Sequence, residues 1–113
     1  MTNLQYENLG ITIAVPMPDT DFKVIAMADY DKAMKCYHVK TYMDKKDIDF
    51  LDIIDDQIII ESDFSTIKTT LTKYIAEKHD AGLYDSYMKR YDYQVDCIEK
   101  GNHFLRLLNS KTA

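Results

Sequence analysis

The residues in this sequence that could most readily do chemistry are carboxylates, which crowd into one short segment. Residues 44–63 carry eight acidic side chains and two lysines, within a chain of 113 residues whose formal net charge is −5. A calcium loop needs oxygen ligands at alternating positions and a glycine at its sharp turn. Here hydrophobic residues fill the intervening positions and the segment has no glycine. The pattern therefore favours a solvated acidic surface over a metal site, and its aspartates are Asp44, Asp47, Asp49, Asp52, Asp55 and Asp56.

Cysteine and histidine are the next residues that could bind a metal. Cys36 and His38 lie two positions apart, so on a strand they would point to the same side, as two zinc ligands do. A second pair at close spacing is missing, because Cys97 and His103 are six positions apart and His79 stands alone. The sequence thus predicts neither a zinc site nor a disulfide framework.

No catalytic motif can be read from the sequence. Three glycines, at positions 10, 82 and 101, cannot build a phosphate-binding loop. The serines lie outside any nucleophile-elbow pattern. Cys36 falls in a strand-like segment and Cys97 among apolar helical positions, and neither has the basic surroundings that lower the pKa of a thiol. We therefore expect no enzymatic activity, no metal and no cofactor.

Tyrosine is unusually frequent, with nine copies. Five of them gather between positions 74 and 93, with Lys89 and Arg90 among them: Tyr74, Tyr84, Tyr87, Tyr91 and Tyr93. Tyrosines with basic neighbours can stack single-stranded bases, but the negative net charge opposes nucleic-acid binding. Tyrosine is also enriched in protein interfaces. We expect Tyr87 and Tyr93 to stay partly exposed and to serve such an interface.

The N-terminal half reads as strands. Alternation of β-branched and small residues predicts a strand over 9–15, which Pro16 and Pro18 end. Further strands are predicted over 22–29 and 34–43 as a hairpin, although a helix over 32–46 competes with the latter. Residues 47–61 combine helical spacing with a short apolar run, so we expect a helix over 47–55 followed by a strand over 57–61.

The C-terminal half reads as helices. Ser62 or Asp63 is expected to cap the first, and Gly82 to end it in the left-handed conformation. Its apolar stripe is Phe64, Ile67, Leu71, Tyr74 and Ile75. A second helix begins near Leu83 with the stripe Tyr84, Met88, Tyr91, Val95 and Ile98. Gly101-Asn102 is expected to interrupt it, with Asn102 capping a last short helix that carries Leu105 and Leu108. The short connection predicts that the two stripes meet inside a monomer.

Together these elements predict one α+β domain over residues 1–113. A small antiparallel sheet of three to four strands, from the N-terminal half, would be packed by the two C-terminal helices. The chain has no run of 18 apolar residues, and its start lacks the basic and apolar regions of a secretory signal. We therefore expect a cytoplasmic protein that does not enter a membrane.

The expected function is that of a small, acidic, non-catalytic protein-binding module. Its partner would be a protein with a basic surface, and it would not bind nucleic acid directly. In size and charge the chain is similar to acidic inhibitors of nucleic-acid-processing enzymes, namely anti-CRISPR and anti-restriction proteins of mobile elements and immunity proteins. Two alternatives stay open, a self-associating structural module and a small enzyme with an unrecognised site. The predicted binding residues are Asp44, Asp47, Asp49, Asp52, Asp55, Asp56, Tyr87 and Tyr93.

Overall fold

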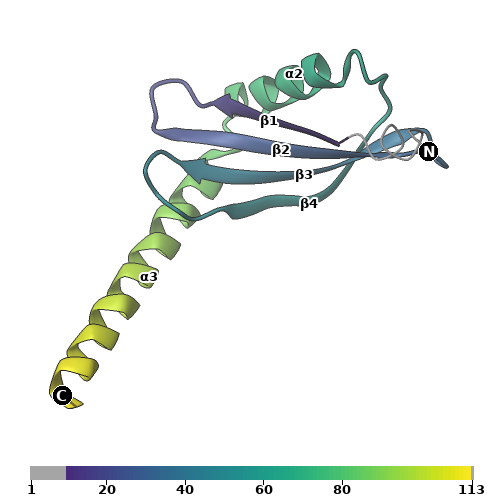
Figure 1. Cartoon of the computed structure of the whole chain (residues 1–113). Coiled ribbons are helices and arrows are strands. Elements are labelled where there is room, and N and C mark those ends of the chain that lie inside the picture. The colour runs from purple at the N-terminus through teal and green to yellow at the C-terminus, as the bar shows by residue number, and fades with distance from the viewer. Residues whose placement is uncertain (1–9, 113) are drawn as a thin grey trace.

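The structure, a computed structural model, describes residues 10–112, apart from the side chains of residues 55, 56 and 109–112. It confirms the α+β fold: an antiparallel sheet in strand order β1-β2-β3-β4 is followed by two C-terminal helices (Figure 1). The strands are β1 (Gly10–Pro16), β2 (Phe22–Asp31), β3 (Cys36–Lys45) and β4 (Asp52–Ile60). The predicted start of the first strand at Leu9 lies outside the described residues.

Side-chain alternation along the strands gives the sheet one covered and one open face. On β2, Val24, Ala26 and Ala28 are buried, whereas Met27 and Asp29 between and beyond them are exposed. Cross-strand pairing keeps this alternation in register, since Ala28 lies opposite Val39 and Ala26 opposite Thr41. Because side chains of a strand alternate between faces, the buried set forms one continuous apolar layer.

The third strand confirms the hairpin prediction and excludes the competing helix over 32–46. The prediction for residues 47–61 was wrong in its first part, because residues 47–51 form a loop and a single strand, β4, begins at Asp52. The helical spacing of Ile48, Leu51 and Ile54 arises by coincidence. Register shifts between β3 and β4 put two extra residues on β4, and an even number keeps the same positions facing inward on both sides of the shifts. The alternation is hidden in the sequence because Asp52 is buried whereas Ile53 and Ile59 are exposed.

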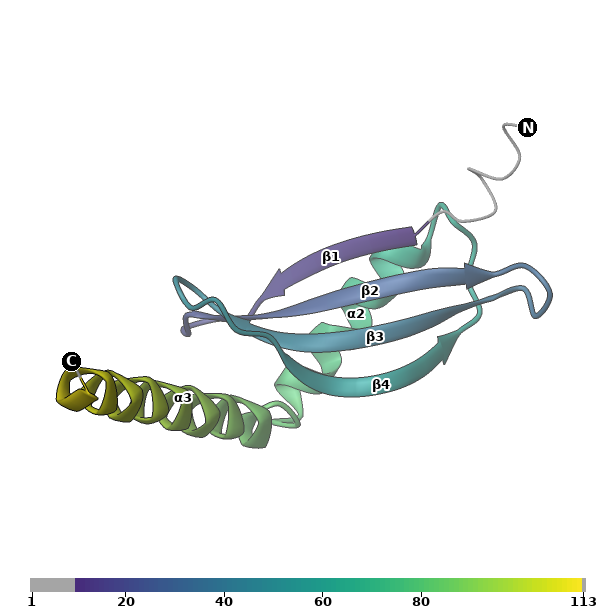
Figure 2. The ribbon, with the colours of Figure 1, turned by 60° about the horizontal axis from the view of Figure 1, so that its bottom comes forward.

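Helix α2 (Ile67–Asp80) packs across the covered face of the sheet (Figure 2). Its residues Ile67, Leu71 and Ile75 have no exposed surface, as the predicted stripe requires. The predicted start was early: residues 64–66 form a turn, and Phe64 is 54% exposed. The predicted side-chain cap is also absent, because the backbone carbonyl of Asp63 accepts the N–H groups of Thr66 and Ile67 instead.

The end of α2 is formed as predicted at Gly82. This residue has a φ of +73°, and the N–H groups of Gly82 and Leu83 donate to the carbonyls of His79 and Lys78. That pair of bonds is the Schellman motif, which turns the chain sharply out of a helix. A side chain at position 82 would be strained in this conformation, so glycine is favoured here.

Helix α3 (Asp85–Thr112) runs unbroken through Gly101 and Asn102, so the predicted interruption and the short third helix were wrong. Its first turns pack on the sheet, where Tyr91 is fully buried. Beyond Val95 the helix leaves the body of the molecule and projects away from both the sheet and α2 (Figures 1 and 2). The predicted stripe is therefore divided: Tyr84 and Tyr91 belong to the core, whereas Ile98 is exposed.

Candidate functional site

Two loops far apart in sequence meet at one end of the sheet. Residues 17–21 join β1 to β2 and residues 46–51 join β3 to β4, and antiparallel order places both at the same end. The backbone N–H of Lys46 donates to the carbonyl of Asp21 at 2.9 Å, which ties the loops together. They carry four exposed carboxylates, which we call the acidic end: Asp19, Asp21, Asp47 and Asp49.

The backbone of these loops is held by local interactions. Asp19 and Asp47 have φ values of +62° and +65°, a region that aspartate enters more readily than most residues. The hydroxyl of Thr20 donates to the carbonyl of Met17 and accepts the N–H of Phe22. Met17 is buried in the core, so the first loop is anchored from within. The carboxylates are therefore presented on ordered turns.

Two of the predicted binding aspartates are used inside the molecule instead. Asp44 lies 3.3 Å from the ammonium of Lys23. Asp52 is nearly buried and accepts a hydrogen bond from Arg90 Nε at 2.8 Å, while another nitrogen of Arg90 donates to the carbonyl of Ile53. The hydrogen bond with Asp52 raises the pKa of Arg90. This pair joins β4 to α3, so we assign Asp52 to the fold.

Of the other predicted residues, Asp47 and Asp49 are exposed at the acidic end. Asp55 and Asp56 lie on β4, but their side chains fall outside the described residues. The remaining carboxylates of the acidic end, Asp19 and Asp21, were missed. They lie outside the acidic run in sequence, and only pairing the predicted strands into an antiparallel sheet would have placed them beside it.

The predicted tyrosines lie close to this end through α3. Tyr87 is half-buried, and the guanidinium carbon of Arg90 sits 5.1 Å from the centre of its ring. Tyr93 is 69% exposed, and its neighbour Asp92 accepts a hydrogen bond from Lys45 Nζ at 2.9 Å. Through Asp92 and through Tyr91, whose hydroxyl donates to the carbonyl of Phe50, the first turns of α3 lie beside the loop of residues 46–51.

An open hollow of about 700 Å³ lies between the two loops. Its lining combines carboxylates with the ammonium groups of Lys23, Lys45 and Lys46, and includes no histidine, cysteine or serine. Such a lining offers charges of both signs and hydrogen-bonding groups to whatever enters the hollow.

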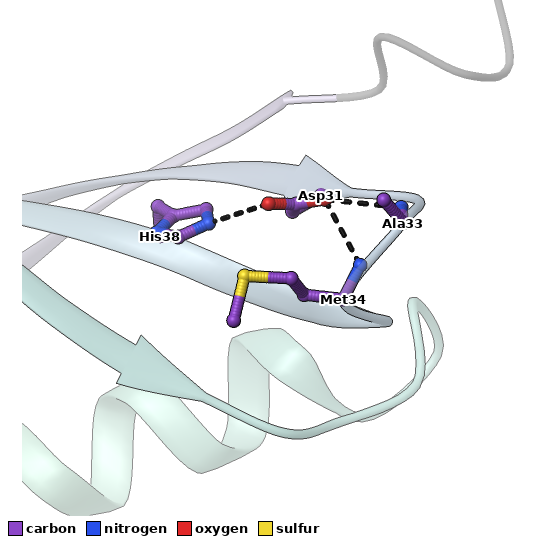
Figure 3. Close-up of polar contacts among 4 residues, drawn as sticks. All are labelled: Asp31, Ala33, Met34 and His38. Carbon is purple, nitrogen blue, oxygen red and sulfur yellow. Dashed lines mark hydrogen bonds and ion pairs between the residues drawn. The ribbon is translucent and has the colours of Figure 1, made fainter.

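His38, the predicted partner of Cys36 in a zinc site, instead contacts Asp31 in the turn between β2 and β3 (Figure 3). His38 Nε2 lies 2.9 Å from Asp31 Oδ2, while Asp31 Oδ1 accepts the N–H groups of Ala33 and Met34. Burial raises the pKa of the Cys36 thiol, which disfavours the thiolate that zinc requires. Among the side chains that the structure describes, which leave out Asp55 and Asp56, no three of the metal-binding types come together.

The turn around Asp31 gives a prediction about pH. The hydrogen bond with His38, followed by the bond with the Met34 N–H, lowers the pKa of Asp31 from its ordinary 3.8. Because the pKa of Asp31 is lower in the folded state than in the unfolded state, the ionised carboxylate stabilises the fold. This contribution is complete above the unfolded-state pKa and is lost as pH falls through the folded-state pKa. We expect the stability difference between wild type and Asp31→Asn to shrink between about pH 5 and pH 2, measured by urea unfolding. A difference that stays constant over this range would contradict the assignment.

Two further observations bear on function. Among residues 10–112, neither α2 nor α3 is apolar enough over a sufficient length to cross a membrane. Comparison of the chain with protein families, curated proteins and solved structures finds no match.

Proposed function

We propose that this chain is a non-catalytic protein-binding module that recognises a partner with a basic surface. The observation that carries the proposal is the acidic end, where two separate loops expose four carboxylates on ordered turns. None of the four forms an ion pair with another described residue. They remain available to cations of a partner, unlike Asp44 and Asp52.

Electrostatics explains why the partner should be basic. Carboxylates concentrated at one end create a local negative potential that steers a positively charged surface into encounter and repels phosphates. A nucleic-acid-processing enzyme presents such a surface in the groove that holds its substrate. Occupying that groove would inhibit the enzyme, in the manner of anti-CRISPR, anti-restriction or immunity proteins.

The test removes the four charges while keeping the loop geometry. Asparagine is the suitable replacement, because it is also tolerated at the positive φ of positions 19 and 47. The matched control removes four exposed carboxylates elsewhere, through Glu61→Gln, Asp63→Asn, Glu77→Gln and Asp80→Asn. Both variants change the net charge equally, so only the location of the charge differs.

Wild type and both variants would be immobilised and used to capture proteins from cells of the native host. We expect wild type and control to retain a basic protein that salt releases, and the variant of the acidic end to lose it. When that protein has been purified, the variant of the acidic end should associate with it at least roughly tenfold more slowly than wild type at low salt, because electrostatic steering is lost. Equal association rates for the two variants would refute the proposal.

A further inference from the structure

Strand β4 carries two residues more than a regular pairing with β3 would take up. One block of the pairing ends where Val39 lies opposite Ile58, and the other begins where Tyr42 lies opposite Ile53. Between these blocks β3 has two residues and β4 has four, so two irregularities follow each other around Thr41. Irregularities of this kind leave backbone groups unpaired and disrupt the ladder. The pairing in the structure, which we call the first register, therefore has a cost in its middle.

The buried side chain at this place adds a second cost. Thr41 is 1% exposed, and its hydroxyl has no hydrogen-bond partner among the described atoms. Removing a hydroxyl from water without giving it a partner is unfavourable. Both costs arise where β4 passes Thr41, so a different pairing of β4 could relieve them.

A regular pairing exists that keeps each side chain on its face of the sheet. Continuing the pairing of Val39 with Ile58 without irregularity brings Ile54 opposite Met43, and we call this arrangement the second register. Because side chains alternate between the two faces, a shift by two residues leaves the buried Ile54 on the covered face. Residues 46–51 then bridge a shorter distance between the strands, so the slack leaves β4 and enters the loop.

Three contacts with α3 hold the first register. The guanidinium of Arg90 donates to the carboxylate of Asp52 and to the carbonyl of Ile53. The hydroxyl of Tyr91 donates to the carbonyl of Phe50. All three acceptors lie on the stretch of chain that a shift of β4 by two residues would move. The register of β4 and the attachment of α3 are therefore coupled.

The second register offers replacements for the contacts that it breaks. Asp52 comes opposite Lys45, so that a cation again lies beside the carboxylate. Lys45 in turn leaves Asp92 of α3, with which it pairs in the first register. Asp56 comes opposite Thr41, which gives the buried hydroxyl a polar neighbour. One set of interactions is thus exchanged for another, which allows two states to lie close in free energy.

We propose that β4 exchanges between the first register and the second register, and that this shift loosens the attachment of α3. The shift also changes how Asp47 and Asp49 are presented, because both lie in the loop that takes up the slack. A partner that binds one register better than the other would move the population toward it. The exchange itself does not depend on binding at the acidic end.

Pairs of cysteines on the open face of the sheet distinguish the two registers. Tyr42→Cys with Ile53→Cys marks the first register, in which these positions lie opposite each other. Asp44→Cys with Ile53→Cys marks the second register, in which position 44 lies opposite position 53. Lys40→Cys with Ile53→Cys is the matched control. Positions 40 and 44 are equally far along β3 from Tyr42, but position 40 lies opposite position 53 in neither register.

Disulfide formation in a glutathione redox buffer measures how often each pair meets. All variants carry Cys97→Ser, which removes the exposed thiol, whereas Cys36 is buried. We expect the pair at 44 and 53 to cross-link at least roughly tenfold faster than the pair at 40 and 53, because diagonal positions are too far apart to bridge. Opening of the whole sheet would favour the shorter loop by less than about twofold. Rates that agree within this factor would overturn the proposal.

A charge removed from α3 tests the coupling. Arg90→Gln is expected to speed cross-linking of the pair at 44 and 53 by roughly fivefold or more, because the contacts that hold the first register are lost. The pair at 40 and 53 should not gain in the same way. Lys89→Gln removes the same charge from an exposed neighbouring position and should leave both rates unchanged. Equal effects of Arg90→Gln and Lys89→Gln would refute the coupling of the register to α3.

Discussion

Replacing Tyr91 with alanine is expected to lower the free energy of unfolding by about 3–5 kcal/mol, the usual cost of removing a large aromatic side chain from a core. Tyr91 has no exposed surface, although it lies on the helix that projects furthest from the body. Its ring centre is 5.5 Å from that of Phe22 and 5.1 Å from that of Phe50. The side chain therefore attaches α3 to both β2 and the loop before β4. Urea unfolding followed by circular dichroism measures the change.

Two variants separate the contributions within this result. The Tyr91 hydroxyl donates to the carbonyl of Phe50 at 2.6 Å, and burial raises the pKa of the phenol, so it stays a donor. Tyr91→Phe should cost about 1–2 kcal/mol, because the carbonyl loses its partner while the ring contacts remain. Tyr93→Ala, at an exposed tyrosine of the same helix, should change stability by less than about 0.5 kcal/mol. Similar losses for Tyr91→Ala and Tyr93→Ala would show that α3 is not anchored through Tyr91.

Much of this architecture follows from sequence periodicity. The alternation over β2 and β3 reports their two faces, and the stripe Ile67, Leu71 and Ile75 reports the buried side of α2. The prediction was wrong for the start of β4 and for the continuity of α3. Along β4 the residue types do not follow burial, since Asp52 is buried and Ile53 and Ile59 are exposed. The penalty of glycine in a helix did not break α3 at Gly101, because about 1 kcal/mol is small against the propensity of the neighbouring residues.

The candidate site was less predictable than the fold. The acidic run marked Asp47 and Asp49 correctly as exposed, but it could not distinguish them from Asp44 and Asp52, whose partners Lys23 and Arg90 are distant in sequence. The division of the α3 stripe into a buried and an exposed part could not be predicted either. Apolar residues at helical spacing look the same whether they face a core, as Tyr91 does, or a surface, as Ile98 does.

Replacing Leu71 with alanine is expected to cost about 2–5 kcal/mol, because the cavity lies where α2 meets the sheet. Leu71 is fully buried on α2. The sheet face that α2 covers includes residues with small side chains. Ala26 and Ala28 on β2 belong to the same buried cluster as Leu71, and such small side chains can fill little of the gap. Against a typical total of about 5–15 kcal/mol for a domain, this loss is large.

The adjacent position supplies the control for this last prediction. Thr72 is exposed, and its hydroxyl donates only to the carbonyl of Lys68 one turn earlier. Thr72→Ala should therefore leave stability unchanged or raise it by a few tenths of a kcal/mol, since alanine favours helix. Among the described residues, α2 is the helix that lies across the covered face of the sheet. Detachment of α2 would therefore expose core residues of the strands to water. Leu71→Ala should accordingly lower the urea midpoint in one transition with an unchanged slope. A second transition at lower urea would instead show that α2 detaches while the sheet persists.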